Sequence, residues 1–474
     1  MSDTMRSSLE SSLRQLKCHF TWNLMKGESS LEDFEDRVLN QCEFQSSDFR
    51  ATVCNILAYL EHHRGQHEAA LEHLRQAEDL IQQQHADHAE LRSLVTWGNY
   101  AWVYYHMGQL SEAQLYLDKV KRVCEKFSSP YRIESPEMDC EEGWARLKCG
   151  GNQNERAKVC FEKALEKQPM NPEFSSGLAI ATYRLDSRPP PQDPIDSLRR
   201  AIRLNPDNQF VKVLLALKLQ KMNEESEAER LVEEALEKVP RETDVLRCAA
   251  RFYRYKEALD QAIDLLKEAS ERMPPNAYLY CRIGCCYRAK VLQTLHRGED
   301  RRYGKRARLP ELIGQAVDYL KKADEANGNL YQICSFLAGL YSLAGRFEEA
   351  EYYFQKEFSK ELTPAEKQML HLRYGSFQLY EMKCEEKAIY HFTEGMKISQ
   401  GGSKQREKIR TKLEKIAQAR LYNNEADSVA LHLLAFLQEM KSKEAWQNDA
   451  DARRRLDAGK RIPSTSLAET ENEK

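Results

Sequence analysis

The stretch LVTWGNYAWVYYHMGQLSEAQLYLDKV, residues 94–120, decides the fold of this chain. Its apolar residues recur every three or four positions on both sides of Gly108, which is the spacing of two amphipathic helices joined by a turn. Small residues stand among large ones, and a small residue lets two helices approach closely where a branched one would block them. The positions concerned are Trp97, Tyr100, Ala101, Tyr104, Ala113, Leu117 and Val120. The stretch therefore predicts a closely packed helix–turn–helix.

The same pattern recurs along most of the chain at about 34 residues, the period of tetratricopeptide repeats. A small residue in the second helix marks most units, at Ala70, Ala113, Ala157, Ala228, Ala262, Ala316, Ala350 and Ala388. One further unit, the fourth, extends from about Pro172 to Pro206 and is interrupted by RPPPQDP. Nine units in series predict an all-α superhelical solenoid of tetratricopeptide repeats, in which each repeat packs on its neighbours.

The repeats and the segments around them divide the chain. Leu13, Leu16, Phe20 and Trp22 predict an apolar face for a helical cap at the N-terminus. The polar C-terminal end predicts a disordered tail. The expected parts are the cap at 1–50, repeats one to four at 51–206, repeats five to seven at 207–326 with a basic insert at 291–308, repeats eight and nine plus terminal helices at 327–440, and the tail at 441–474.

Composition and motifs predict a binding scaffold that catalyses no reaction. The net charge is -3, no apolar run is long enough for a membrane span, and the first residues lack the apolar core of a signal peptide. We therefore expect a cytoplasmic protein whose cysteines are reduced. Cys281, Cys285 and Cys286 are predicted to pack in the core. No phosphate-binding loop, metal-binding or nucleophile motif occurs, so we predict no enzyme activity, no cofactor and no metal.

Charge is unevenly distributed along this near-neutral chain. Residues 245–308 contain 15 Lys or Arg against 7 Asp or Glu, and residues 401–420 contain 7 against 2. Within or near these regions, a Tyr-Arg pair ends the first helix of three repeats. The pairs are Tyr183-Arg184, Tyr253-Arg254 and Tyr287-Arg288. First helices line the concave side of such a solenoid, so the pairs could face one groove, with guanidinium groups for phosphates and rings for bases. Packing tyrosines and solvated arginines are the alternative.

Several longer strings resemble one family, the interferon-induced proteins with tetratricopeptide repeats. They are RSLVTWGNYAWVYYHMGQLSEAQ (92–114), DCEEGWARLKCGG (139–151), AIRLNPDNQFVKVLLALKL (201–219) and EYYFQKEFSKELTPAEKQ (351–368). The resemblance implies a cytoplasmic antiviral effector that binds RNA in a basic groove, with AU-rich, duplex-like RNA favoured over a 5′-triphosphate end. It also implies a homodimer formed by helix exchange, complexes with other family members and a translation initiation factor, inhibition of translation, and promotion of apoptosis.

The resemblance also suggests positions for the RNA contacts. The candidates are Arg184, Arg251, Arg254, Arg288 and Lys290, with a basic rim at Arg406, Lys408 and Arg410. Trp144, Arg37 and Gln41 match residues that relatives place near the 5′ end of RNA, although Trp144 also occupies a packing position of the third repeat. The interrupted fourth repeat is a plausible hinge for helix exchange, and a surface loop of a monomer is the alternative. A protein-interaction adaptor without direct RNA contact remains the competing function.

Overall fold

The computed structural model contains helices and no other regular structure in the residues that it describes. These are residues 3–26, 31, 34, 38, 50–84, 89–127, 129–186, 193–272, 275–296, 308–327, 330, 332–399 and 401–459. The chain divides into two compact units, Met1–Arg301 (unit 1) and Arg302–Lys474 (unit 2). Arg37, Gln41 and residues 297–307 of the basic insert lie outside the described residues.

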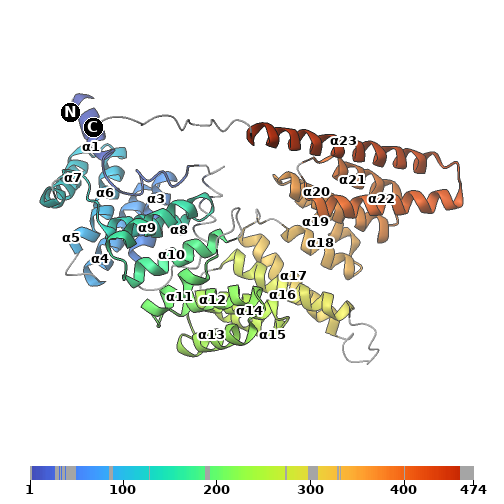
Figure 1. The fold of residues 1–474 in the computed structure, drawn as a ribbon, viewed down its shortest axis with the longest axis horizontal. Helices are drawn as coiled ribbons and strands as arrows, with labels where there is room; N and C mark the ends of the chain where they lie inside the picture. The colour runs from blue at the N-terminus through green and yellow to red at the C-terminus, as the bar shows by residue number, and fades with distance from the viewer. Residues whose placement is uncertain are drawn as a thin grey trace, which may run out of the picture. The chain divides into compact units, whose positions relative to one another are not determined.

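Unit 1 is a series of antiparallel helix pairs that follow one another along the chain (Figure 1). Its helices are α1 (Asp3–Leu13), α3 (Arg50–His63), α4 (His67–Gln84), α5 (Ala89–Arg92), α6 (Leu94–His106), α7 (Leu110–Cys124), α8 (Pro136–Cys149), α9 (Asn154–Lys167), α10 (Pro172–Leu185), α11 (Ile195–Leu204), α12 (Gln209–Lys221), α13 (Glu225–Lys238), α14 (Thr243–Tyr255), α15 (Leu259–Glu271) and α16 (Ala277–His296). Two short 3₁₀ turns follow α7 and α8 at Glu125–Phe127 and Gly151–Gln153. The pairs coincide with the predicted repeats, and the predicted solenoid is confirmed.

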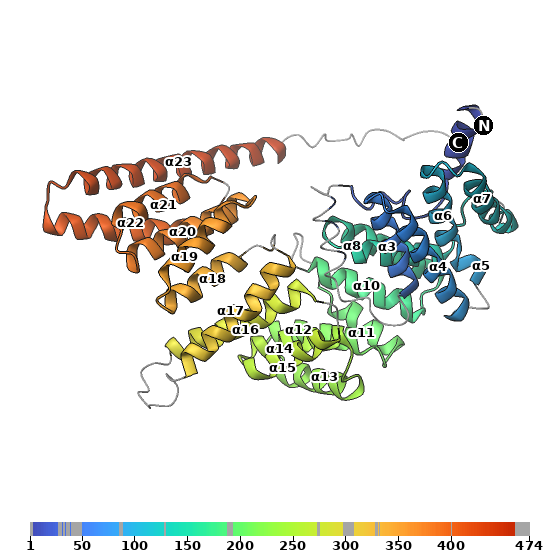
Figure 2. The same ribbon diagram turned by 180° about the vertical axis from the view of Figure 1, so that it is seen from behind.

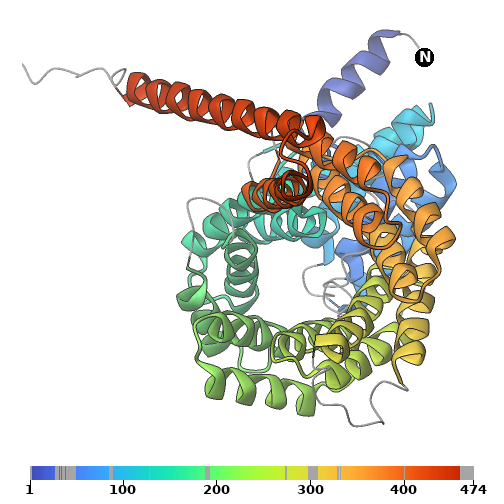
Figure 3. The same ribbon diagram turned by 90° about the vertical axis from the view of Figure 1, so that its right-hand side faces the viewer.

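The first helices of consecutive repeats pack directly on one another, α8 on α10, α10 on α12 and α12 on α14. Figure 3 shows the pairs of unit 1, from teal to yellow-green, arranged along a curve. The curvature brings Lys148 of α8 close enough to Asp244 of α14, three repeats later, to influence its ionisation. The first helices therefore form the concave surface of unit 1, as the sequence predicted.

The turn between the two helices of a repeat needs one residue with positive φ. Glycine occupies it at Gly65, Gly108 and Gly345, with φ of +78°, +77° and +74°, and the turn between α8 and α9 has two, Gly150 and Gly151, with φ of +64° and +52°. Asn223 and Glu257 adopt φ of 65° and 59° at the corresponding turns. Glycine is favoured here because it has no Cβ to clash in the left-handed region.

Close approach of helices within unit 1 depends on small residues, as the sequence predicted. The fully buried ring of Phe161 on α9 is inserted against α8 and α10 at Gly143 and Gly177. A Cβ at Gly177 would lie 2.2 Å from the nearest ring carbon, and one at Gly143 would lie 2.8 Å from it. Both distances are shorter than a carbon–carbon contact allows, so each glycine is required by packing.

Replacing Gly177 by alanine should lower the free energy of unfolding by roughly 1–3 kcal/mol, because the added methyl overlaps the Phe161 ring. Gly314 provides a matched control, since a Cβ there meets no atom within 4 Å. Gly314→Ala should raise stability by roughly 0.5–1 kcal/mol through helix propensity alone. Urea denaturation of both variants measures the two changes in the free energy of unfolding. If both variants change it in the same direction, the packing explanation is wrong.

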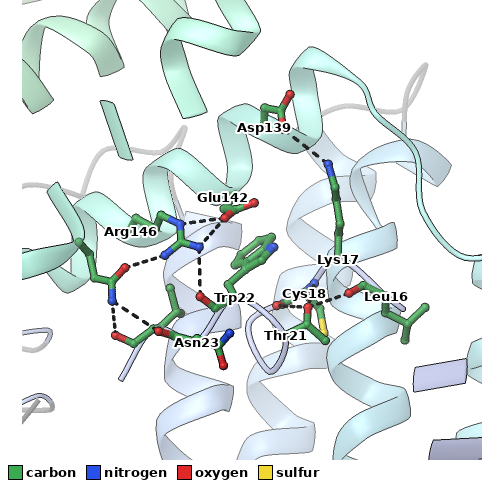
Figure 4. Close-up of polar contacts among 11 residues, drawn as sticks. Leu16, Lys17, Cys18, Thr21, Trp22, Asn23, Asp139, Glu142 and Arg146 are labelled. Atoms are coloured by element: carbon green, nitrogen blue, oxygen red, sulfur yellow. Dashed lines mark hydrogen bonds and ion pairs between the residues drawn. The ribbon is translucent and has the colours of Figure 1, made fainter. Parts of the chain in front are cut away.

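The N-terminal segment is bound to helix α8 by polar contacts (Figure 4). Arg146 donates to the Trp22 carbonyl oxygen at 3.0 Å and to Oε1 of Gln153 at 2.6 Å. Gln153 in turn donates to the Leu24 carbonyl at 2.8 Å. Leu13, Leu16 and Trp22 are buried in the adjoining apolar core. The predicted cap therefore consists, in its described part, of helix α1, a non-helical segment up to residue 26 and the helical residues Leu31, Phe34 and Val38, of which Phe34 and Val38 are buried in the same core.

Unit 2 continues the helical pairs and ends in two longer helices. Its helices are α17 (Leu309–Ala326), α18 (Ile333–Leu343), α19 (Phe347–Phe358), α20 (Pro364–Tyr380), α21 (Glu385–Lys397), α22 (Ser403–Asn423) and α23 (Ser428–Gly459). Helices α22 and α23 lie side by side (Figure 2) and share a core with Phe392 of α21. Ile409, Leu413 and Ile416 form the buried apolar face of α22.

Two predictions about chain ends and inserts need correction or extension. Helix α23 continues to Gly459, so residues 441–459 are helical where the sequence predicted a disordered tail. The polar composition there is that of an exposed helix as much as that of a coil, which composition alone does not distinguish. At the other insert, residues 291–296 extend helix α16, one of the two possibilities that the sequence left open.

Candidate functional site

The last turn of α14 carries two cations of the predicted site that reach solvent. Arg251 is exposed and Arg254 is partly exposed, and Tyr255 beside them is 52% exposed. The guanidinium carbons of the two arginines lie 5.7 and 5.5 Å from the Tyr255 ring centre. A hydrogen bond from Arg251 to the phenol oxygen lowers the pKa of Tyr255. The two arginines thus frame an exposed aromatic ring on the concave surface.

Arg184 lies deeper, at the end of α10. Its guanidinium donates to the Leu147 carbonyl of α8, and desolvation together with nearby Arg247 lowers its pKa to about 10. Asp244 lies in the same region, 3.9 Å from Arg247, and burial raises the pKa of its carboxyl to about 7. Because burial makes ionisation of this carboxyl group unfavourable, Asp244 offsets little of the positive charge around it.

Arg288 and Lys290 of α16 differ in their surroundings. Arg288 is partly buried, and desolvation lowers its pKa, while neighbouring Cys285 is close enough to partly oppose that shift. Arg254 and Arg282 approach the same cysteine. Lys290, in contrast, forms an ion pair with Asp260 of α15. The structure therefore brings Arg288 together with the α14 arginines, and it engages Lys290 with a carboxylate.

These contacts connect six arginines into one group, which we call the arginine cluster. Its members are Arg184, Arg247, Arg251, Arg254, Arg282 and Arg288. Lys148 of α8 is buried beside it. Sequence reasoning missed Lys148 and Arg247 as site residues. The available signal was a charged residue inside an otherwise apolar first helix, in ARLKC and DVLRCAA.

The paired tyrosines do not play the part that one interpretation of the sequence gave them. Tyr253 and Tyr287 are only 8% and 5% exposed, so they are packing residues and offer no face to a base. Burial also raises the pKa of Tyr183 to about 12. The exposed ring is Tyr255, two residues after Tyr253. The stacking role predicted for the pairs is therefore wrong for Tyr253 and Tyr287.

The predicted basic rim belongs to unit 2 and forms local contacts there. Arg406 donates to the carbonyl oxygens of Ile398 and Ser399 after the end of α21, the latter at 2.9 Å. Arg410 pairs with Glu407 at 2.9 Å, and Lys408 is exposed. Arg406 and Arg410 are thus engaged in contacts within unit 2. The role of the rim in RNA binding stays a prediction.

Trp144 occupies the packing position that the sequence indicated. It is 2% exposed, and its ring meets that of Phe161 edge-on at 5.1 Å between centres. Within the described ranges, no three His, Cys, Asp or Glu side chains are grouped so that they could hold a metal ion. In the same part of the chain, no helix is both long and apolar enough to cross a membrane.

Comparison with known proteins agrees with the repeat assignment. The model of the tetratricopeptide repeat family matches residues 49–126, and that of the N-terminal repeat region of Psidin matches residues 191–291. The human "Interferon-induced protein with tetratricopeptide repeats 2" is 69% identical over 98% of this chain and 99% of its own length. The mouse protein of the same name is 58% identical over 99% of both chains.

Solved structures give the same result at lower identity. An IFIT1 monomeric mutant with Gppp-AAAA superposes with a TM-score of 0.78 at 42% identity, covering 94% of this chain and 99% of that one. The human IFIT1 dimer with m7Gppp-AAAA gives a TM-score of 0.75 at the same identity and coverage. The resemblance predicted from the quoted strings is therefore confirmed, and the chain belongs to the family of interferon-induced proteins with tetratricopeptide repeats.

Proposed function

We propose that this protein is an interferon-induced antiviral scaffold of the cytoplasm that binds RNA on the concave surface of unit 1. The observation that carries the proposal is the arginine cluster, in which Arg251, Arg254 and the exposed ring of Tyr255 lie beside buried cations. Guanidinium groups bind phosphates and an exposed ring stacks on bases, which together suit RNA. The structures of IFIT1 with capped and triphosphate-bearing RNA support this ligand class.

Within this proposal, AU-rich, duplex-like RNA is the preferred ligand, as the sequence resemblance implies. Proteins bind duplex RNA mainly through its phosphates and 2′-hydroxyls rather than through base edges. The six guanidinium groups, on the first helices of three repeats (α10, α14 and α16), supply contacts of that kind along a surface. Trp144 is packed against Phe161, so capture of a cap by its ring would require that contact to change.

Equilibrium binding across a salt series tests the proposal. The logarithm of affinity should fall steeply with the logarithm of salt concentration, with a slope of about −3.6 or steeper if at least four phosphates are contacted. An AU-rich duplex should bind more tightly than a GC-rich duplex of equal length, a capped strand or a strand with a 5′-triphosphate. Absence of binding to every RNA, or affinity independent of salt, would contradict the proposal.

Protein partners belong to the same proposal. We propose that the scaffold forms a homodimer by exchange of helices around the interrupted fourth repeat, binds relatives and a translation initiation factor, and thereby inhibits translation and promotes apoptosis. The dimeric state recorded for human IFIT1 supports dimerisation in this family. Sedimentation of the full chain at the mass of a monomer would exclude the homodimer. Partners retained from nuclease-treated extract by a chain that binds no RNA would favour the adaptor function instead.

A further inference from the structure

Helix α16 carries two cysteines one turn apart in the middle of the basic surface. Cys281 and Cys285 are four residues apart, which places both on the same side of the helix. Both are partly exposed, whereas their neighbour Cys286 is fully buried. The core packing predicted for all three cysteines is therefore found for Cys286, whereas Cys281 and Cys285 are only partly covered.

The surroundings of Cys285 favour its thiolate. The Cys281 thiol donates a hydrogen bond to the Cys285 sulfur, and the guanidinium groups of Arg282, Arg288 and Arg254 lie nearby. The hydrogen bond, together with these charges, outweighs desolvation and lowers the pKa of Cys285 below the usual value of a thiol. Burial, in contrast, raises the pKa of Cys286 to about 11. A thiolate is the reactive form of cysteine, so we expect Cys285 to be the most reactive cysteine of α16.

We propose that Cys285 is a site of reversible S-thiolation, in which a small cellular thiol of the glutathione type becomes attached to the concave surface after oxidation by a peroxide. In the first step the Cys285 thiolate attacks one peroxide oxygen, so that the O–O bond breaks, an S–O bond forms and hydroxide leaves. The sulfur is oxidised to a sulfenic acid and the peroxide is reduced. In the second step the small thiol attacks that sulfur, an S–S bond forms and water leaves.

Helix geometry explains why an external thiol, and not Cys281, completes the reaction. Cβ atoms four residues apart on a helix are separated by about 5–6 Å. A disulfide requires its Cβ atoms to lie about 3.5–4.5 Å apart, so a bond between Cys281 and Cys285 would distort the helix. Cys281 is accordingly a positioning residue, which stabilises the Cys285 thiolate through its hydrogen bond.

The consequence for RNA binding rests on the function proposed above. A glutathionyl group brings two carboxylates and one ammonium among Arg254, Arg282 and Arg288. These carboxylates would compete with RNA phosphates for the same guanidinium groups, and the added bulk would cover the surface. The adduct should therefore lower RNA affinity by at least about tenfold, since like charges placed together oppose binding strongly. Reduction with dithiothreitol should restore the affinity.

Peptide mass spectrometry of the full chain, treated with hydrogen peroxide and glutathione across a pH series, tests the site. We expect the adduct first at Cys285, with a rate that rises through a midpoint below the pKa of an ordinary cysteine thiol. Cys281→Ser should move this midpoint upward, because a serine hydroxyl replaces the thiol donor at a shorter reach. Cys384→Ser is the matched control: Cys384 is partly exposed in unit 2, and its loss should leave the rate at Cys285 unchanged.

The outcomes separate the two proposals. Equal labelling of Cys384 and Cys285, or a midpoint unchanged in Cys281→Ser, would overturn the modification site. If Cys285 is modified selectively but the untreated chain binds no RNA, the modification site stands and the proposed function fails. If RNA binds and the Cys285 adduct leaves its affinity unchanged, the site stands and its effect on the surface is refuted.

Discussion

A chain in which Arg251 and Arg254 are both replaced by glutamate should bind RNA at least about 100-fold more weakly than the unaltered chain. Each substitution removes one guanidinium from phosphate and introduces a repelling carboxylate, and losing two contacts should also reduce the salt slope by about 2. Both side chains reach solvent from the last turn of α14, where their replacement leaves the core intact. Fluorescence anisotropy with a labelled AU-rich duplex measures the loss.

The matched control carries the same change of charge away from the concave surface. Arg203 at the end of α11 and Arg241 before α14 are both exposed, and neither belongs to the arginine cluster. Arg203→Glu with Arg241→Glu should change the RNA affinity by less than about threefold, because only the overall electrostatic potential of the protein changes. Equal losses in the two double variants would show that net charge, and not the cluster, determines binding.

Arg184 makes a poorer test, although the sequence alone proposes it on equal terms with Arg254. Its guanidinium is buried and donates to the Leu147 carbonyl, so a glutamate there would leave that carbonyl unpaired and place a charge in the core. Lost RNA binding in that variant would not distinguish a missing contact from a disturbed repeat. The exposed pair on α14 avoids this ambiguity.

The repeats could be predicted from the sequence because their signal is local and repeated. Small residues such as Ala101 and Ala113 stand at fixed spacing, and each one is fully buried in the structure. Membership of a family of binding scaffolds also agrees with the prediction that this chain is no enzyme. One pattern that recurs nine times at a fixed period is the signature of a repeat fold.

The functional surface could be predicted only in part, because it depends on contacts between repeats. Tyr253 and Tyr255 lie two positions apart, which on a helix points them in very different directions. The neighbouring repeat covers the first and leaves the second exposed, and no pattern within α14 reveals which one it covers. Lys148 and Asp244 are nearly a hundred positions apart, so the curvature of the solenoid, and not sequence spacing, brings them together.

The N-terminal segment shows a further consequence of such long-range contacts, because one arginine holds it on the third repeat. Replacing Arg146 by methionine should lower the free energy of unfolding by roughly 3 kcal/mol, since the side chain is buried and its loss leaves the Glu142 carboxylate uncompensated. The Trp22 carbonyl also loses its donor. The segment before residue 50 should detach first and become sensitive to protease.

Denaturation of the full chain by urea and limited proteolysis at its N-terminus measure both effects. Arg146→Met combined with Glu142→Leu should recover much of the stability, because removing both charges of a buried pair is far less costly than removing one. Arg14→Met is the control: that arginine is 71% exposed and, among the described residues, pairs with Glu10 one turn earlier, so its loss should leave the unfolding midpoint unchanged. If the Arg146 and Arg14 variants unfold at the same midpoint, the N-terminal segment is held by its apolar residues, Leu13, Leu16 and Trp22, and the buried arginine contributes nothing to its attachment.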